Sequence, residues 1–236
     1  MFSERYEGFH RARIGLSRAT IARSSRGESE RGRVGVTSGA DDTNSAEYTR
    51  RLLELQGQRW KRVLDVQAPY RWNLRRLQLG FTLDLGCGIG RTLVNLGGNG
   101  VGVDHNPESV NICRARGLSA FTPEQFRASE YGVTASFDSL LLSHVIEHMT
   151  ELEAKQLVGE YVGDIKPGGL LVLITPQEVG YRSDSTHVHF ADFQVNAAVC
   201  ESLGAHVVRQ YSFPFPRFVG RIFIYNEFIT VARLPA

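Results

Sequence analysis

The chain has 236 residues, of which 42% are hydrophobic, so it is long and apolar enough for one packed domain with a tail. Its formal net charge of +2 is too small to indicate nucleic-acid binding. The sequence has no run of about 18 apolar residues, the length that a membrane-spanning helix needs. The three cysteines form no CxxC pair, which argues against a zinc ribbon or a disulfide framework. We therefore expect a cytoplasmic protein with neither a nucleic-acid nor a membrane partner.

The first part of the chain, residues 1–44, is rich in Arg, Ser and Gly and lacks a sustained hydrophobic period. Such a composition predicts a disordered extension. A transit peptide, a nucleic-acid arm and a start codon assigned too far upstream are the alternatives. Over residues 45–79 apolar positions recur with a period near 3.6, which predicts a helical cap. Within this cap, Tyr70, Arg71 and Trp72 could form a lid over a ligand or could simply pack within helices.

Residues 80–236 alternate short apolar runs with helical stretches, a pattern typical of βαβ units in a parallel sheet. We expect strands over Phe81–Leu85, Gly100–Val103, Leu118–Phe121, Phe137–Leu142, Gly169–Ile174, His206–Phe213 and Arg221–Leu234. We expect helices over Gly90–Leu96, Pro107–Arg116, Pro123–Ser129, Glu151–Val162 and Asp192–Leu203. The predicted fold class is α/β: a doubly wound, seven-stranded, mostly parallel sheet with helices on both faces and an antiparallel C-terminal hairpin.

A glycine-rich turn with the sequence GCGIG, from Gly86 to Gly90, follows the first strand and opens a helix. Glycines at alternate positions let the backbone turn tightly and approach a ligand, and the helix N-terminus offers unpaired N–H groups. Dinucleotide sites use the spacing GxGxxG, whereas this turn has GxGxG preceded by an acid, Asp84. An acid at the strand end suits a ligand with a cationic group better than a pyrophosphate.

A second acid, Asp104, ends the next strand, at the position where a carboxylate can accept both ribose hydroxyls. It could instead cap the helix that begins at Pro107, although Asn106 can supply that cap. With these acids and glycines in order, about residues 81–175 resemble the class I, Rossmann-like, S-adenosylmethionine-dependent methyltransferases. The glycine turn, the second acid and the segments FDSLLLSHVIEHM and IKPGGLLVLITP carry the resemblance.

This resemblance implies a site for S-adenosylmethionine and a role for each matching residue. The glycines would pass under the methionine part of the ligand. His105 would lie beside the adenine, which Phe121 and Thr122 would flank. Ser143 and His144 would face the sulfonium. The implied cofactor-binding residues are Asp84, Gly86, Cys87, Gly88, Gly90, Asp104, His105, Phe121, Thr122 and Ser143.

The segment HVIEH follows the fourth predicted strand. If it is helical, His144, Glu147 and His148 share one face at the sheet edge where α/β proteins bind ligands. The segment, with a later histidine loop, is similar to ubiquinone-pathway O-methyltransferases and small-RNA 2′-O-methyltransferases. That resemblance implies a divalent metal ion held by Glu147 and His148, with His187 or His189 as the later ligand. His144 replaces a glutamate of the pattern, which favours an ion that accepts imidazole ligands. The alternative is that the segment is structural, with Glu147 in an ion pair and His148 packed.

An alcohol is a poor nucleophile at neutral pH, so its methylation needs a general base or a metal ion. We predict that His144 or His187 takes the proton and that Glu147 orients an imidazole or the ion, which makes these three the candidate catalytic residues. The predicted activity is O-methylation of a hydroxylated small molecule of the sugar or phenol/catechol type, by a monomer or homodimer. An RNA 2′-O-methyltransferase and a non-catalytic S-adenosylmethionine-binding regulator are the alternatives.

We expect the acceptor pocket between the N-terminal helices, the loop Pro176–Phe190 and the aromatic linker Phe213–Phe218. Arg182 and Arg217 lie in the loop and the linker, respectively. These two arginines could bind an acidic acceptor or could be solvated surface residues.

Overall fold

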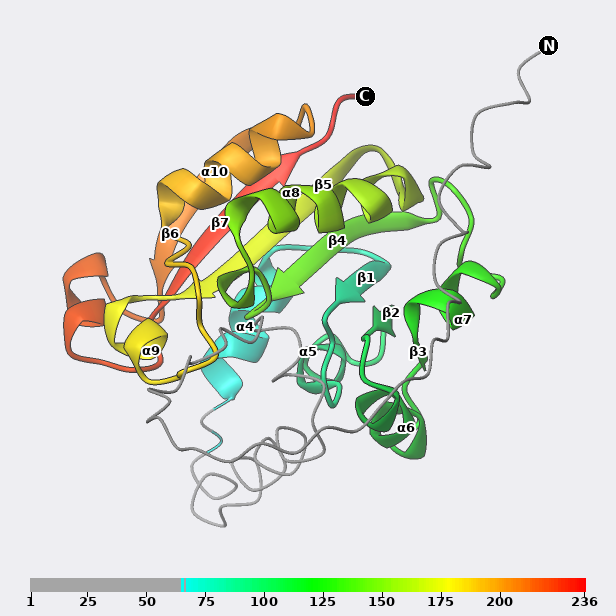
Figure 1. Ribbon diagram of the computed structural model, residues 1–236, viewed down its shortest axis with the longest axis horizontal. Coiled ribbons are helices and arrows are strands. Elements are labelled where there is room, and N and C mark those ends of the chain that lie inside the picture. The colour runs from blue at the N-terminus through cyan, green and yellow to red at the C-terminus, as the bar shows by residue number, and fades with distance from the viewer. Residues whose placement is uncertain (1–64, 66) are drawn as a thin grey trace, which may run out of the picture. The chain divides into compact units, whose positions relative to one another are not determined.

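The computed structural model describes Asp65 and residues 67–236 (Figure 1). The predicted extension over residues 1–44 and the first part of the predicted cap, residues 45–64, lie outside the described residues. The described part of the cap holds one helix, α4 (Ala68–Arg76), with Pro69 in its first turn. Proline is tolerated there because N–H groups of the first turn have no partner within the helix.

Seven strands form one sheet in the order β3-β2-β1-β4-β5-β7-β6. The strands are β1 (Thr82–Leu85), β2 (Gly100–Val103), β3 (Ala120–Phe121), β4 (Phe137–Ser143), β5 (Ile165–Pro176), β6 (His206–Phe213) and β7 (Glu227–Arg233). Strands β1 to β5 pair in parallel, whereas β7 runs antiparallel to both of its neighbours. The predicted mostly parallel sheet with an antiparallel C-terminal hairpin is thus confirmed.

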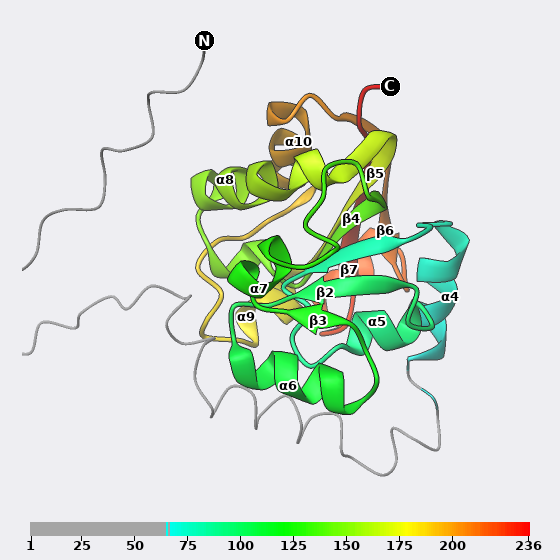
Figure 2. The same cartoon turned by 90° about the vertical axis from the view of Figure 1, so that its right-hand side faces the viewer.

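Helices cover both faces of this sheet (Figure 2). Besides α4 they are α5 (Arg91–Asn95), α6 (Pro107–Ala115), α7 (Pro123–Arg127), α8 (Glu151–Tyr161), α9 (Glu178–Arg182) and α10 (Phe193–Ser202), with the short 3₁₀ helices η1 (Ile146–His148), η2 (Val162–Asp164) and η3 (Arg217–Arg221). Helices α7, α8 and α10 bury Phe126, Val158 and Val199 against one face. Helices α4 and α5 bury Leu74 and Leu93 on the other face, where α6 also lies. No helix in the described part of the chain is both long and apolar enough to cross a bilayer.

The sheet register brings four segments to one edge. Leu85, the last residue of β1, pairs with Leu142 near the end of β4, so the glycine turn and the HVIEH segment begin side by side. On the other side of β4, the last residue of β5, Pro176, pairs with Glu227, the first residue of β7. This carboxyl edge of the parallel strands is where ligands bind in open α/β sheets.

One local prediction near this edge was wrong, and a second expectation, which was conditional on a helix, does not apply. The last strand begins at Glu227 rather than Arg221, because residues 217–221 form η3 and the chain reaches the sheet only afterwards. The HVIEH segment is not a continuous helix, because η1 covers only its last three residues. His144 lies before η1 with a φ of 59°, in the left-handed region, so it does not share a helical face with His148.

Candidate functional site

The glycine turn adopts a backbone conformation that favours glycine. Gly86, Gly88 and Gly90 have φ angles of 72°, 52° and 80°. A Cβ on Gly86 would lie 2.5 Å from Val145 Cγ2, and a Cβ on Gly90 would lie 2.5 Å from Leu118 Cδ1. The turn therefore packs directly against the segment after β4, which brings the two predicted halves of the site into contact.

Asp84 is a buried carboxyl group directly before this turn. Its side chain lies in β1, is 1% exposed, and has one oxygen, Oδ2, without a hydrogen-bond partner among the described residues. Burial, and then the nearby charge of Asp104, raises the pKa of Asp84 to about 8, while Arg91 opposes the shift. A buried carboxyl group with an unpaired oxygen is suited to a cationic ligand group that would restore its charge balance.

Asp104 organises the turn from the end of β2. Its Oδ2 accepts the backbone N–H of Gly88 at 2.7 Å, and its Oδ1 accepts the backbone N–H of Asn106 at 2.9 Å. The helix cap that was the alternative role for Asp104 is made by the side chain of Asn106, which accepts the N–H of Glu108. Asp104 thus fixes the glycine turn without serving as the helix cap.

The remaining predicted cofactor residues lie in the turn or at the ends of strands β2, β3 and β4. Cys87 is buried in the turn, whereas the His105 side chain is 49% exposed after β2. Phe121 and Ser143 are half-buried at the ends of β3 and β4. Thr122 forms a reciprocal capping box at the start of α7, so its hydroxyl already has a structural role.

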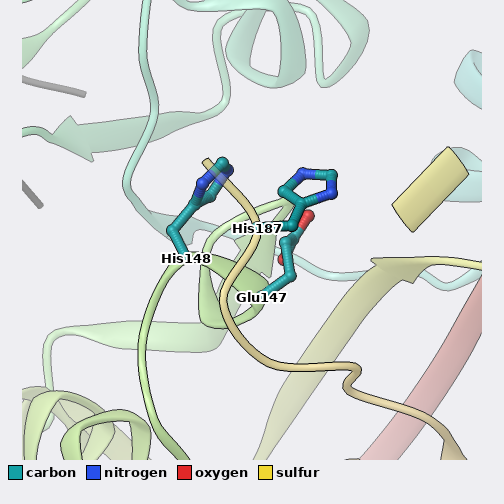
Figure 3. Close-up of side chains that lie close together, drawn as sticks. All are labelled: Glu147, His148 and His187. Atoms are coloured by element: carbon teal, nitrogen blue, oxygen red, sulfur yellow. The ribbon is translucent and has the colours of Figure 1, made fainter. Parts of the chain in front are cut away.

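The histidine and glutamate cluster is assembled from two segments (Figure 3). Glu147 and His148 lie on η1, and His187 lies in the loop between α9 and α10. One possible ligand atom from each residue lies within 4.8 Å of those of the other two. The backbone N–H of Val188 donates to the carbonyl oxygen of Glu147 at 2.9 Å, which ties the loop to η1. In Figure 3 the Glu147 carboxylate points toward the His187 ring.

Both imidazoles of this cluster are held through Nδ1. His187 Nδ1 lies 2.7 Å from the carbonyl oxygen of Tyr181, and a carbonyl only accepts, so Nδ1 carries the proton. His148 Nδ1 lies 3.3 Å from the Thr186 carbonyl oxygen and 3.1 Å from the Thr186 hydroxyl, which itself donates to a carboxylate. Burial lowers the pKa of His148, although the charge of Glu147 opposes this shift. When the proton of a neutral imidazole is on Nδ1, Nε2 carries none. These contacts therefore leave Nε2 of both rings, in this tautomer, as an acceptor.

Glu147 is fully buried, and neither of its carboxylate oxygens has a hydrogen-bond partner within the described chain. Its Oε1 lies 3.2 Å from His144 Nδ1, which is an ion-pair distance without hydrogen-bond alignment. Burial alone would raise the pKa of Glu147, but the contact with His144 and the charge of that ring hold it below its ordinary value. A buried, ionised carboxylate with an unpaired oxygen indicates room for a further positive partner.

His144 is held between two carboxylates. Its Nδ1 faces Glu147, and its Nε2 lies 2.9 Å from Oε1 of Glu227. Burial alone would lower the pKa of His144, but the contacts with Glu147 and Glu227 raise it to about 9. The ring is therefore charged at neutral pH and both of its nitrogens are engaged, so this geometry does not favour the predicted role of His144 as the proton acceptor.

Residues 83–173 match the family described as a methyltransferase domain. This stretch of the chain is a methyltransferase domain, and its fold is that of S-adenosylmethionine-dependent methyltransferases of known structure. No curated protein matches the chain in sequence.

Solved structures share the fold of this methyltransferase at low sequence identity. A methyltransferase from Archaeoglobus fulgidus has 18% identity and a TM-score of 0.52, over 70% of this chain and 92% of the other. A chain in the complex between the Haloferax volcanii Trm112 methyltransferase activator and a methyltransferase has 18% identity and a TM-score of 0.59, over 84% and 98%. Magnesium protoporphyrin IX methyltransferase from Synechocystis, with bound S-adenosylhomocysteine, has 14% identity and a TM-score of 0.58, over 83% and 97%.

Other predicted site residues of the methyltransferase lie outside the cluster or have structural partners. His189 donates its backbone N–H to the carbonyl oxygen of Glu147 but is not part of the ligand group, and its buried Nε2 has no partner in the described part of the chain. Arg217 forms two hydrogen bonds of 2.6 and 2.7 Å to Glu178, so its guanidinium is engaged within the protein. Arg182 is exposed.

The predicted lid residues of the methyltransferase have three different environments. Tyr70 is half-buried and donates its hydroxyl to the carbonyl oxygen of Tyr225 at 2.8 Å. Arg71 pairs with Asp65, whereas the Trp72 side chain is 56% exposed. Tyr70 therefore packs α4 against the linker after β6.

Proposed function

We propose that this methyltransferase transfers a methyl group to a hydroxyl group of a small molecule, of the sugar, phenol or catechol type, in the cytoplasm. The cluster of Glu147, His148 and His187, which lies at the carboxyl edge of the sheet beside the glycine turn, carries this proposal. A hydroxyl group must lose its proton to become a good nucleophile, and imidazole nitrogens beside a carboxylate can assist that loss directly or through an ion. The three free cysteines are compatible with a reducing compartment.

The donor side of the site supports S-adenosylmethionine as the methyl donor. When bound, this molecule supplies an activated methyl group on a sulfonium. The unpaired Oδ2 of Asp84 would accept the ammonium group, and Gly86 would allow the methionine part to approach the backbone. Asp104, placed at the end of β2, would accept the ribose hydroxyls, and Phe121 would flank the adenine.

We also propose that Glu147, His148 and His187 hold a divalent metal ion. When bound, such an ion lowers the pKa of a hydroxyl group that it contacts. The residues fit an ion because the Glu147 oxygens are buried without hydrogen-bond partners. They also fit because each imidazole is oriented through Nδ1 by a neighbouring oxygen, the arrangement that usually orients histidine ligands. Two imidazoles and one carboxylate favour a first-row transition ion over magnesium.

His144 and Glu227 support this cluster from the other side. Glu227 holds the His144 ring at Nε2, and the charged ring faces Glu147 through Nδ1. In this proposal His144 keeps Glu147 ionised and oriented, and it does not take a proton itself. His187 provides an unprotonated Nε2, either as a ligand to the ion or as the proton acceptor predicted from the sequence.

Titration of Mn²⁺ into the full chain, followed by electron paramagnetic resonance, tests the metal site without an acceptor. We expect one bound ion in the unmodified chain, its loss in His187→Ala, and its retention in His206→Ala, which removes an exposed histidine on β6. A mass-spectrometric screen of hydroxylated and amine acceptors, with and without EDTA, then tests the reaction. Methylated products only from amines would contradict the proposed acceptor class. If a hydroxylated acceptor is methylated equally well with and without EDTA, the proposed metal site is wrong and His187 remains as the proposed proton acceptor.

A further inference from the structure

The linker between β6 and β7 exposes a group of large apolar side chains. We call residues 214–226 the apolar loop; it contains η3 and lies beside α9 (Figure 1). Five of its side chains are well exposed: Phe215 at 47%, Phe218 at 69%, Ile222 at 81%, Ile224 at 38% and Tyr225 at 52%. Single exposed apolar residues are ordinary on a protein surface, but five on one short loop make that loop a candidate interaction site.

The apolar loop is held in place by buried polar contacts, so its exposed side chains are presented by a fixed backbone. Asn226 is fully buried, and its side chain donates to Gln177 and accepts the backbone N–H of Phe215 at 3.0 Å. A Cβ on Gly220 would lie 1.8 Å from Oε1 of Gln177, so the loop closes tightly over that glutamine. The core contacts of the loop are satisfied, and its outer side remains exposed.

The charged side chains of the apolar loop itself are all basic. Residues 212–226 include Arg217 and Arg221 and contain no Asp or Glu. Arg217 is paired with Glu178 on α9, but Arg221 and the neighbouring Arg182 are exposed. The surface therefore combines aromatic and aliphatic side chains with unburied arginines.

Helix α4, which contacts the apolar loop, also exposes an aromatic side chain next to an arginine. The Tyr70 hydroxyl, on α4, donates to the carbonyl oxygen of Tyr225 in the loop. Helix α4 exposes Trp72, and the Arg76 guanidinium lies 4.9 Å from the centre of that indole ring. Tryptophan and arginine are both common at the interface between a bilayer and water.

We propose that the apolar loop, with Arg182 and Arg221, docks this methyltransferase on the surface of an anionic lipid bilayer. Aromatic and aliphatic side chains would enter the boundary between headgroups and acyl chains, and the arginines would contact phosphate groups. Our expectation of no membrane partner rested on the absence of a spanning segment, whereas docking by a surface loop needs none. The negative charge of the cytoplasmic leaflet complements the loop.

Charge and shape disfavour two other occupants. A second copy docked loop to loop would bring like charges together, because each loop carries arginines and no acid. A single-stranded nucleic acid could stack its bases on the aromatic side chains of the loop, but it would leave Ile222, the most exposed side chain, without an apolar partner. An acyl-chain boundary accepts both kinds of side chain.

Co-sedimentation of the full chain with lipid vesicles tests this proposal. Vesicles of phosphatidylcholine with phosphatidylglycerol would be compared with vesicles of phosphatidylcholine alone. We expect binding to the anionic vesicles only, weakened by salt, and about tenfold weaker in the double variant Phe218→Ser with Ile222→Ser. The matched control is Leu152→Ser with Val133→Ser, which removes two similarly exposed apolar side chains, from α8 and from the loop after α7.

Arg221→Glu should weaken binding to the anionic vesicles in the same assay. S-adenosylmethionine binding, measured on every variant by calorimetry, reports whether the fold is intact, so failure of docking is distinguishable from failure of the methyltransferase site. Absence of vesicle binding, or equal binding by the double variant and its control, would overturn the proposal. Two other results would also overturn it. Light scattering could show a dimer only in the unmodified chain, which would assign the loop to a second copy. The double variant could lose RNA binding rather than vesicle binding, which would assign the loop to RNA.

Discussion

The proposed donor side and the proposed acceptor side of this site are built in different ways. The predicted donor residues come from one stretch of about forty residues, β1 to β3, and lie at or directly after the ends of these strands. The acceptor side collects Glu147, His187 and Glu227 from three segments that lie far apart in the sequence. A local motif can therefore identify the donor, whereas the acceptor site depends on how β4, β5 and β7 are aligned.

The sharpest test of this comparison is Glu147→Gln, which keeps the shape of the side chain and removes its charge. Turnover should fall about 10³-fold, because the substitution removes a proposed metal ligand and leaves the charged His144 ring without one of its two carboxylates. The dissociation constant for S-adenosylmethionine should change by less than about twofold, because Glu147 lies outside the glycine turn. Steady-state kinetics and calorimetry on the same preparation measure both quantities. A parallel loss of donor affinity would show that the two sides are not separable.

Asp104→Asn makes the reverse change on the donor side. Affinity for S-adenosylmethionine should fall about 10²-fold, because the amide loses the charge that holds the Gly88 N–H and that would bind the ribose. Turnover at saturating donor should change little. Calorimetry gives the affinity, and Glu108→Gln, which alters a neighbouring exposed acid on α6, is the control. If turnover at saturation fell with affinity unchanged, Asp104 would belong to the reaction and not to donor binding.

Glu227→Gln tests whether the end of β7 supports the acceptor side. The variant should bind Mn²⁺ about tenfold more weakly and turn over about tenfold more slowly, since His144 would lose the partner that orients it toward Glu147. Glu227→Asp should recover part of the metal affinity, because it restores the charge with a shorter reach. A purely structural role would instead lower the melting temperature and leave metal affinity unchanged.

Much of the fold followed from local patterns in the sequence. The sheet class and the Asp84-to-Gly90 turn could be predicted because alternating apolar runs and closely spaced glycines are patterns among residues that are near one another in the sequence. Glu227 was missed for the opposite reason. The predicted strand began at Arg221, and only the pairing of Pro176 with Glu227 brings this acid beside His144. The supporting role that we propose for His144, in place of the predicted role as proton acceptor, also rests on that long-range contact.

The smallest predicted effect concerns protons on the donor side. In the free protein the pKa of Asp84 is raised to about 8, chiefly by burial, so at pH 7 the carboxyl group is mostly protonated. Binding a cationic ammonium favours the ionised form, so close to one proton should be released for each donor molecule bound at about pH 7, and fewer above about pH 8. Donor affinity should therefore rise with pH below about pH 8 and then level off. Calorimetry in buffers with different heats of ionisation measures this release.

The same shift has a consequence for stability. A carboxyl group whose pKa is about 8 when folded and near 4 when unfolded favours the folded state at low pH and loses that contribution as the pH rises toward 8. The donor should then raise the melting temperature more at about pH 8 than at about pH 6, because it compensates a charge that is otherwise unpaired. Asp84→Asn should abolish both the proton release and this pH dependence. If the substitution left the release intact, the protons would come from the ligand, and the burial of Asp84 would serve the fold rather than the donor.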